Sequence, residues 1–163
     1  MSSRPNILYI MSDDHAAHAI SAYGSKINKT PNIDRLAEEG VRLDNAFCTN
    51  ALCTPSRASI LTGQYSHVNE VKTLDDEIDS SRPIQSQKLM KEAGYETAII
   101  GKWHLGNNEA SNPQGFDYWN ILPGQGDYYD PLMIENGVEK QLEGYVTDLI
   151  TDIAVDWLDS RDN

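Results

Sequence analysis

A chain of 163 residues with 39% hydrophobic and 23% charged side chains has the length and composition of a globular domain with a real core. Its 25 acidic and 13 basic residues give a net charge of −12, which argues against nucleic acid as a partner because such binding needs a basic surface. No apolar run reaches the length of a membrane span, so we expect no membrane partner either.

The N-terminal residues lead directly into a strand-like run, without the apolar core and cleavage site of a signal peptide. We therefore expect the chain as written to be cytoplasmic, and periplasmic or secreted if a signal has been removed. The sequence contains two cysteines, which are too few for a disulfide framework.

Residues 6–12 form a nearly continuous apolar run and predict a buried strand with both faces covered. The run ends at Asp13 and Asp14, and open α/β sheets hold their sites at the carboxyl ends of strands. Neighbours in a strand point to opposite faces, so both carboxylates can meet one ion only if the backbone curls there. Hard oxygen ligands suit Ca²⁺ or Mg²⁺, although an exposed turn would carry the same pair.

The next segment predicts a helix followed by a strand. Thr30 can cap a helix over residues 31–39, Pro31 suits its first position, and Gly40 can end it. Residues 41–47 alternate roughly between apolar and polar and predict a strand.

A second short helix is predicted over about residues 55–62. Thr54 is a good N-cap residue, Pro55 suits the first helical position, and Gly63 can take the left-handed conformation that ends a helix.

The start of this helix is a candidate anion site. Its free N–H groups and its dipole favour negative charge at that end, which lies just after Cys53. Arg57 belongs to the first turn and can face the same spot. A capped helix beside a buried cysteine is the alternative interpretation.

Residues 64–82 show no clear period and predict a loop. Pro83 opens a predicted helix over residues 84–93, which Gly94 ends. Residues 97–101 then predict a short buried strand.

That strand leads into the sequence Gly-Lys-Trp-His-Leu-Gly. Lys102 and His104 are two residues apart, so in an extended segment both point one way while Trp103 points to the core. A cation and a titratable imidazole would then face one pocket. Such a pair, taken alone, is also common on ordinary surfaces.

Residues 105–143 are rich in glycine, asparagine, proline and aromatics and predict a long loop of the kind that usually carries function. Within it, residues 124–130 are candidates for lining a substrate pocket, and a surface loop with aromatic anchors is the alternative. Residues 146–158 carry apolar side chains at helical spacing and predict an amphipathic helix. The alternation of strands and helices indicates the α/β class.

The Asp-Asp pair, the Cys-x-Pro-Ser-Arg signature and the Gly-Lys-Trp-His-Leu-Gly motif resemble, in this order, three motifs of one family. Over essentially its whole length the chain resembles the type I, formylglycine-dependent sulfatases of the alkaline phosphatase-like superfamily. The resemblance implies an α/β/α sandwich with a central, mostly parallel sheet, of which residues 1–163 are the N-terminal portion. Asp-Asp-His and the later loop look most similar to sulfatases acting on sulfated sugars, such as N-acetylglucosamine-6-sulfatases.

In this family the signature cysteine is oxidised to a formylglycine aldehyde, so Cys53 is by resemblance the precursor of the nucleophile. A Cys48–Cys53 disulfide is not expected, because it would consume that residue. The aldehyde hydrate carries two hydroxyls, of which one attacks sulfur and the other drives the collapse that releases sulfate. A serine would instead be left as a stable sulfate ester. The resemblance also implies that Asp13, Asp14 and residue 53 bind Ca²⁺, with Mg²⁺ possible.

The remaining motif residues take roles by resemblance. Arg57 steadies the aldehyde hydrate and the charges of the metal site, and Lys102 holds both sulfate and the hydrate. His104 hydrogen-bonds the hydrate and helps its collapse. A substrate contact and a structural role are both compatible with His15.

The implied function is hydrolysis of a sulfate ester on a small molecule or glycan, with a formylglycine-generating enzyme as maturation partner. A phosphonate monoester or phosphodiester hydrolase of the same superfamily and a non-catalytic module binding sulfated glycans are the alternatives. Sulfatases continue well beyond the point that corresponds to Asn163 and bring further metal and substrate ligands there. We therefore expect this chain alone to be incomplete and inactive.

Overall fold

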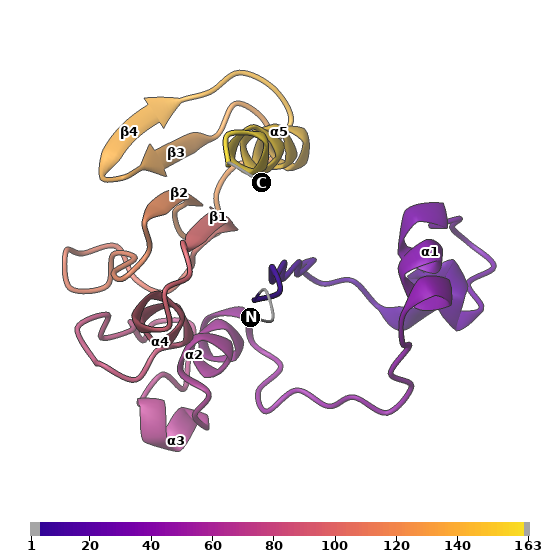
Figure 1. The fold of residues 1–163 in the computed structure, drawn as a ribbon, viewed down its shortest axis with the longest axis horizontal. Coiled ribbons are helices and arrows are strands. Elements are labelled where there is room, and N and C mark those ends of the chain that lie inside the picture. The colour runs from indigo at the N-terminus through magenta and orange to yellow at the C-terminus, as the bar shows by residue number, and fades with distance from the viewer. Residues whose placement is uncertain (1–3, 162–163) are drawn as a thin grey trace. The chain divides into compact units, whose positions relative to one another are not determined.

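The structure is a computed structural model that describes residues 4–161 (Figure 1). The chain divides into two compact units, Met1–Phe47 and Cys48–Asn163. None of the helices within the described residues is long and apolar enough to cross a membrane.

The N-terminal unit is built from short helical elements: η1 (Ala17–Ala19), η2 (Ser21–Tyr23) and α1 (Pro31–Glu39). As predicted, Thr30 is the N-cap residue, Pro31 is the first residue of α1, and Gly40 follows its end. The Asp34 carboxylate accepts hydrogen bonds from Ser21 Oγ at 2.6 Å and Thr30 Oγ1 at 3.0 Å. These bonds, that from Ser21 first, lower the pKa of Asp34 and tie η2 to the first turn of α1.

The prediction of two strands in this unit is wrong. Residues 6–12 and 41–47 have no strand assignment, and their apolar side chains are exposed, with Ile10 at 76% and Phe47 at 90%. A strand needs a partner strand for its N–H and C=O groups. Among the described residues, the hydrogen-bonded strands all lie beyond residue 97.

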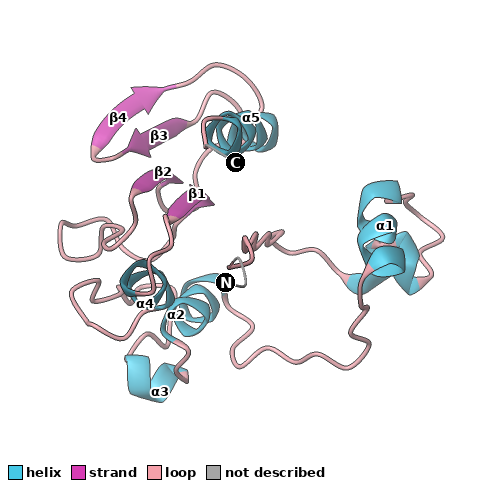
Figure 2. Ribbon diagram, in the orientation of Figure 1, coloured by secondary structure: helices cyan, strands magenta, loops and turns pink. Residues whose placement is uncertain are grey.

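The C-terminal unit combines a four-stranded sheet with helices (Figure 2). Its helices are α2 (Cys53–Thr62), α3 (Ser66–Asn69), α4 (Ser86–Glu92) and α5 (Val146–Asp159). Its strands are β1 (Ala98–Lys102), β2 (Tyr118–Leu122), β3 (Leu132–Glu135) and β4 (Val138–Gln141). The predicted α/β class is confirmed, as are the strand at 97–101 and the last helix, each within one residue.

The sheet is mixed, which corrects the expectation of a mostly parallel one. In the order β1-β2-β3-β4, only β1 and β2 run parallel, and the other two pairs are antiparallel. For the β3–β4 pair the reason lies in Asn136 and Gly137, which join these two strands with φ values of 47° and 88°. Two successive residues with positive φ form the tight turn of a hairpin, which only antiparallel strands allow. Residues 105–143 therefore contain three strands within the predicted loop.

The core covers both faces of this sheet. Ile121 and Ile134 belong to a cluster that includes Ala58 of α2, whereas the adjacent Leu122 and Met133 pack with residues of α5. Because neighbours in a strand point to opposite faces, α2 and α5 lie on opposite sides of the sheet.

Helix α5 packs closely against β1 at Gly101. A side chain there would meet Ile150 Cγ2 of α5 at 3.3 Å, and the φ of Gly101 is +106°, which disfavours other residues.

The predicted loop at 64–82 contains α3, and α4 begins at Ser86 rather than at residue 84. Asn69, at the end of α3, links it to α2. Its Nδ2 donates to Gln64 O at 3.0 Å and lies 3.4 Å from Thr62 Oγ1, and its Oδ1 accepts from the Val71 N–H at 2.9 Å.

We expect Asn69→Ala to lower the free energy of unfolding by about 1–3 kcal/mol, because the buried polar groups that now hydrogen-bond to Asn69 would lose this partner. Denaturant titration of the full-length protein measures this loss. The matched control is Asn107→Ala, at an exposed position, for which we expect less than about 0.5 kcal/mol. Equal losses in the two variants would contradict the expectation.

The hydrogen bonds of Asp117 lead us to expect that the stability of the fold depends on pH. Its carboxylate accepts hydrogen bonds from Lys91 Nζ at 2.5 Å and from the Thr97 N–H at 3.0 Å. The bond from Lys91, aided by Thr97, holds the pKa of Asp117 below its ordinary value. A lowered pKa contributes stability above the ordinary carboxyl pKa, and this contribution is lost as pH falls through the folded-state pKa.

We expect Asp117→Asn to be less stable than the parent protein at neutral pH, with the gap closing as the medium is acidified below the ordinary carboxyl pKa. Urea midpoints of both proteins across that range measure the gap. A gap that stays constant with pH would contradict the assignment.

Candidate functional site

Helix α2 begins at Cys53 itself, two residues earlier than predicted, with Leu52 as the N-cap residue. Thr54 is therefore a buried residue of the first turn and does not cap the helix. Pro55 remains compatible with this turn because the first N–H groups of a helix have no partner within it. Gly63 ends the helix with φ 65°, as predicted.

The strands β1 and β2 bring two further residues toward one edge of the sheet. Because these strands are parallel, their carboxyl ends meet at the same edge, where open sheets hold ligands. Lys102 is the last residue of β1, and Gln125 lies in the loop that follows β2. Trp103 is 1% exposed, and its Nε1 donates to Ser111 O at 2.9 Å, which confirms that this side chain turns to the core.

The structure brings three of the predicted site residues together. Arg57 Nη1 donates to the Lys102 carbonyl at 2.6 Å, and Lys102 Nζ donates to Gln125 Oε1 at 2.5 Å. Gln125 Nε2 in turn donates to Cys53 Sγ at 4.0 Å. Gln125 thus links Lys102 to the half-buried Cys53, the first residue of α2, and Arg57 lies four residues further along the same helix. Two cationic side chains near the N-terminal end of a helix favour a bound anion.

His104 departs from the expected geometry. Its φ is 50°, so the chain is not extended at this point, and the two-residue spacing from Lys102 does not make the two side chains point the same way. The side chain is half-buried directly after the buried Trp103. A left-handed residue with a side chain is uncommon and often marks a constrained site.

Asp13, Asp14 and His15 belong to the N-terminal unit. The backbone bends at the aspartate pair, and Asp14 has φ 46°. This curl is the condition under which adjacent carboxylates can turn toward one ion. His15 Nδ1 lies 3.1 Å from Ser12 Oγ, and all three site residues are exposed.

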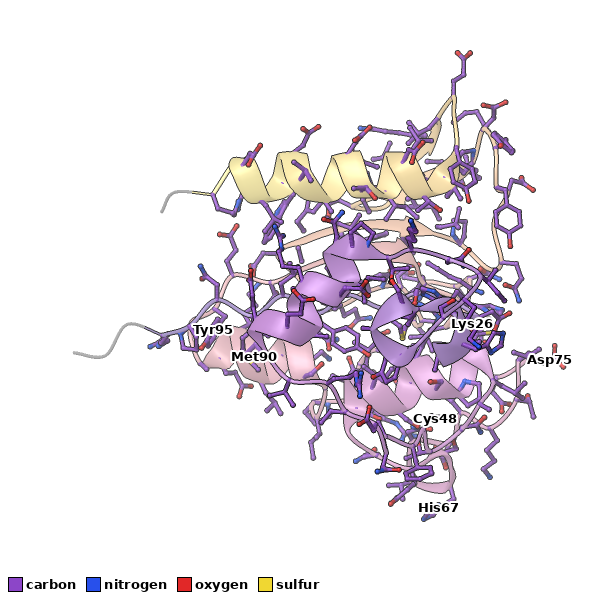
Figure 3. All side chains as sticks on the ribbon, turned by 90° about the vertical axis from the view of Figure 1, so that its right-hand side faces the viewer. Lys26, Cys48, His67, Asp75, Met90 and Tyr95 are labelled. Atoms are coloured by element: carbon purple, nitrogen blue, oxygen red, sulfur yellow. The ribbon has the colours of Figure 1, made fainter. Side chains whose placement is uncertain are left out.

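Two residues near the signature are placed outside this cluster. His67 lies on α3, where it is exposed and points outward (Figure 3). It stacks on Tyr65 with ring centroids 5.8 Å apart. Cys48 is exposed, and both it and Cys53 are free thiols.

Gln125 is the residue that the sequence did not single out. The sequence places it within residues 124–130, the candidate lining of a substrate pocket, but assigns it no role of its own. Its two flanking glycines are the signal that could have drawn attention to it, because glycines mark a loop whose backbone must take positive φ.

Both the sequence and the fold of this chain are similar to those of known proteins. Residues 5–163 match the family described as Sulfatase. An N-acetylglucosamine-6-O-sulfatase of Bacteroides thetaiotaomicron is 49% identical over 99% of this chain, and human arylsulfatase D is 37% identical over 87% of it. The chain spans 28% of the length of each of these relatives.

The solved structure of BT4656 in complex with its substrate D-glucosamine-2-N,6-O-disulfate matches with a TM-score of 0.92 and 48% identity, over 98% of this chain and 32% of that one. The fold of the described residues is thus that of the corresponding part of a sulfatase. With the family match along nearly its whole length, the chain belongs to the sulfatase family.

Proposed function

We propose that residues 1–163 are the N-terminal portion of a catalytic domain that hydrolyses a sulfate ester on a carbohydrate, with a 6-O-sulfated glucosamine unit as the substrate. The observation that carries the proposal is the cluster in which Gln125 links Lys102 to Cys53 and Arg57 donates to the Lys102 carbonyl. The substrate class rests on the similarity to the N-acetylglucosamine-6-O-sulfatase and to BT4656 with its disulfated glucosamine.

The chain's own residues supply binding and charge. A sulfate group beside residue 53 would meet the N-terminal end of α2, the Lys102 ammonium and the Arg57 guanidinium. These groups are held before the substrate arrives, because Arg57 is fixed on the Lys102 carbonyl and Lys102 on Gln125. Preorganised cations of this kind stabilise negative charge that develops on sulfate oxygens during ester cleavage.

Residue 53 fits conversion to formylglycine. Cys53 is a free thiol at the first position of α2, and its sulfur lies within the polar cluster. Formylglycine, when formed by a maturation enzyme, supplies as its hydrate a hydroxyl nucleophile that a thiol lacks. Around it, Lys102 orients the sulfate, and we assign His104 to hydrogen-bonding at residue 53.

The aspartate pair fits a hard cation in part. Asp13 and Asp14 offer carboxylate oxygens on a bent backbone, which suits Ca²⁺ or Mg²⁺. Calcium takes about six to eight oxygen ligands. No group of three or more His, Cys, Asp and Glu side chains converges anywhere in residues 4–161. These two residues would therefore provide one part of a calcium shell, and His15 is a candidate for substrate contact beside them.

The test is turnover by the full-length protein co-expressed with a formylglycine-generating enzyme. We expect release of sulfate from glucosamine 6-sulfate with a higher kcat/KM than hydrolysis of an aryl phosphodiester or a phosphonate monoester. Faster hydrolysis of the phosphorus esters would favour the related hydrolases. Binding of sulfated glycans without any turnover by fully converted protein would favour a binding module.

A further inference from the structure

Gln125 stands between two groups of the site, and both ends of its amide are engaged. Its Oε1 accepts from Lys102 Nζ at 2.5 Å, and its Nε2 donates to Cys53 Sγ at 4.0 Å. A lysine ammonium has donors only, so the amide oxygen must face Lys102, and the amide nitrogen must then face residue 53. The contact with Lys102 therefore fixes which end of the amide residue 53 meets.

The loop backbone holds Gln125 in this place. Gly124 and Gly126 flank it with φ values of 56° and 68°. A side chain at position 126 would lie 2.3 Å from Leu122 Cγ, so only glycine lets the loop pass this closely over the end of β2. Since β2 and β1 are parallel neighbours, this loop lies beside the end of the strand that carries Lys102.

We propose that Gln125 is a further functional residue of this site, an inference that rests on the proposed sulfatase function. Its oxygen positions the Lys102 ammonium, and its N–H donates to the oxygen that residue 53 carries after conversion. An amide suits both tasks, because it offers an acceptor to a cation and a donor to an oxygen without adding charge. A glutamate of the same shape would keep the Lys102 contact but turn a negative oxygen toward residue 53.

The two tasks are separated by comparing Gln125→Glu with Gln125→Leu in the converted full-length protein. Activity is normalised to the converted fraction, and thermal midpoints confirm that each variant folds. We expect kcat to fall by about 10²-fold or more for both variants, because each loses the preorganised N–H donor to residue 53. The matched control is Gln114→Glu, which adds the same charge beside α4, where the Gln114 carbonyl accepts from Gln87.

A role confined to holding Lys102 predicts a different result, because glutamate preserves that contact and only leucine removes it. Near-parental activity of Gln125→Glu together with reduced activity of Gln125→Leu would therefore overturn the donation to residue 53. Activity of both Gln125 variants equal to that of Gln114→Glu would overturn the proposal as a whole.

A second readout does not depend on conversion or on turnover. In protein made without the maturation enzyme, the Cys53 thiol is alkylated with iodoacetamide at one fixed pH, and peptide masses give the rate. We expect Gln125→Glu to slow alkylation several-fold, because a carboxylate replaces the N–H that faces the sulfur, and thiolate is the reactive form. Cys48, which is exposed, serves as the internal control.

The alkylation rate distinguishes a failure of the proposed function from a failure of the inference about Gln125. If the converted parent protein cleaves no sulfate ester, the proposed function fails, and alkylation alone decides whether Gln125 acts on residue 53. Alkylation of Cys53 at the parental rate in Gln125→Glu would overturn the inference, whatever the substrate proves to be.

Discussion

Replacing Cys53 by alanine in the full-length, maturase-treated protein is expected to lower kcat by at least about 10⁴-fold, as for the loss of other enzymes' nucleophiles. The sulfur lies within the cluster formed with Gln125 and Lys102, and alanine leaves that cluster with no nucleophile. Sulfate release from glucosamine 6-sulfate measures the loss. Because Cys53 is half-buried at the start of α2, we expect the fold to persist.

Two further variants sharpen this result. Cys53→Ser supplies a single hydroxyl, so we expect a stable sulfate ester on residue 53, visible as an adduct in the peptide mass after incubation with substrate. Cys48→Ser is the matched control, because Cys48 is an exposed free thiol, and its activity should equal that of the parent. Loss of activity in Cys48→Ser, or full activity in Cys53→Ala, would contradict the assignment.

The largest effect on stability is expected from Trp103→Ala, which should lower the free energy of unfolding by about 3–5 kcal/mol. The indole is 1% exposed and belongs to the cluster that joins Ala58 of α2 to Ile121 of β2. Alanine would leave a cavity there and would remove the N–H donor to the buried Ser111 carbonyl. Since Trp103 separates Lys102 from His104, we also expect the cluster around residue 53 to loosen.

Chemical denaturation of the full-length protein measures this effect. Trp103→Phe keeps much of the buried area but loses the hydrogen bond, so its loss should be intermediate. Trp157→Ala is the comparison at a half-buried position, where Trp157 stacks on Tyr118 with ring centroids 6.4 Å apart. A loss for Trp103→Ala no larger than that for Trp157→Ala would show that this core cluster does not stabilise the fold.

Elements with local signals were predictable. The caps of α1 and the apolar spacing of α5 gave their positions, and Gly63 gave the end of α2. The β3–β4 hairpin also had a local signal in Asn136-Gly137, which the loop-like composition of residues 105–143 obscured.

The N-terminal run shows why the rest was not predictable. Its apolar pattern indicates a buried strand, but a strand forms only where another offers hydrogen bonds, and that depends on parts of a fold distant in sequence. Residues 6–12 therefore remain exposed and unpaired with any strand among the described residues.

Part of the candidate site could likewise be predicted from the sequence, and part of it could not. Cys53 and Arg57 are four residues apart in α2 and lie one above the other on one side of it, so their proximity follows from helical spacing. The link from Cys53 to Gln125 joins residues that are 72 positions apart, and it required the tertiary structure. At His104 the spacing argument assumes an extended chain, and a φ of 50° cannot be read from the sequence.

The central claim is that residue 53 becomes the nucleophile, and the mass of the peptide containing Cys53 tests it most directly. The protein is produced together with a formylglycine-generating enzyme and treated with an aldehyde-reactive probe before digestion. We predict that the peptide has the formylglycine mass and that the probe attaches at residue 53. An unmodified thiol at this position, in a preparation where a known sulfatase is fully converted, would contradict the account.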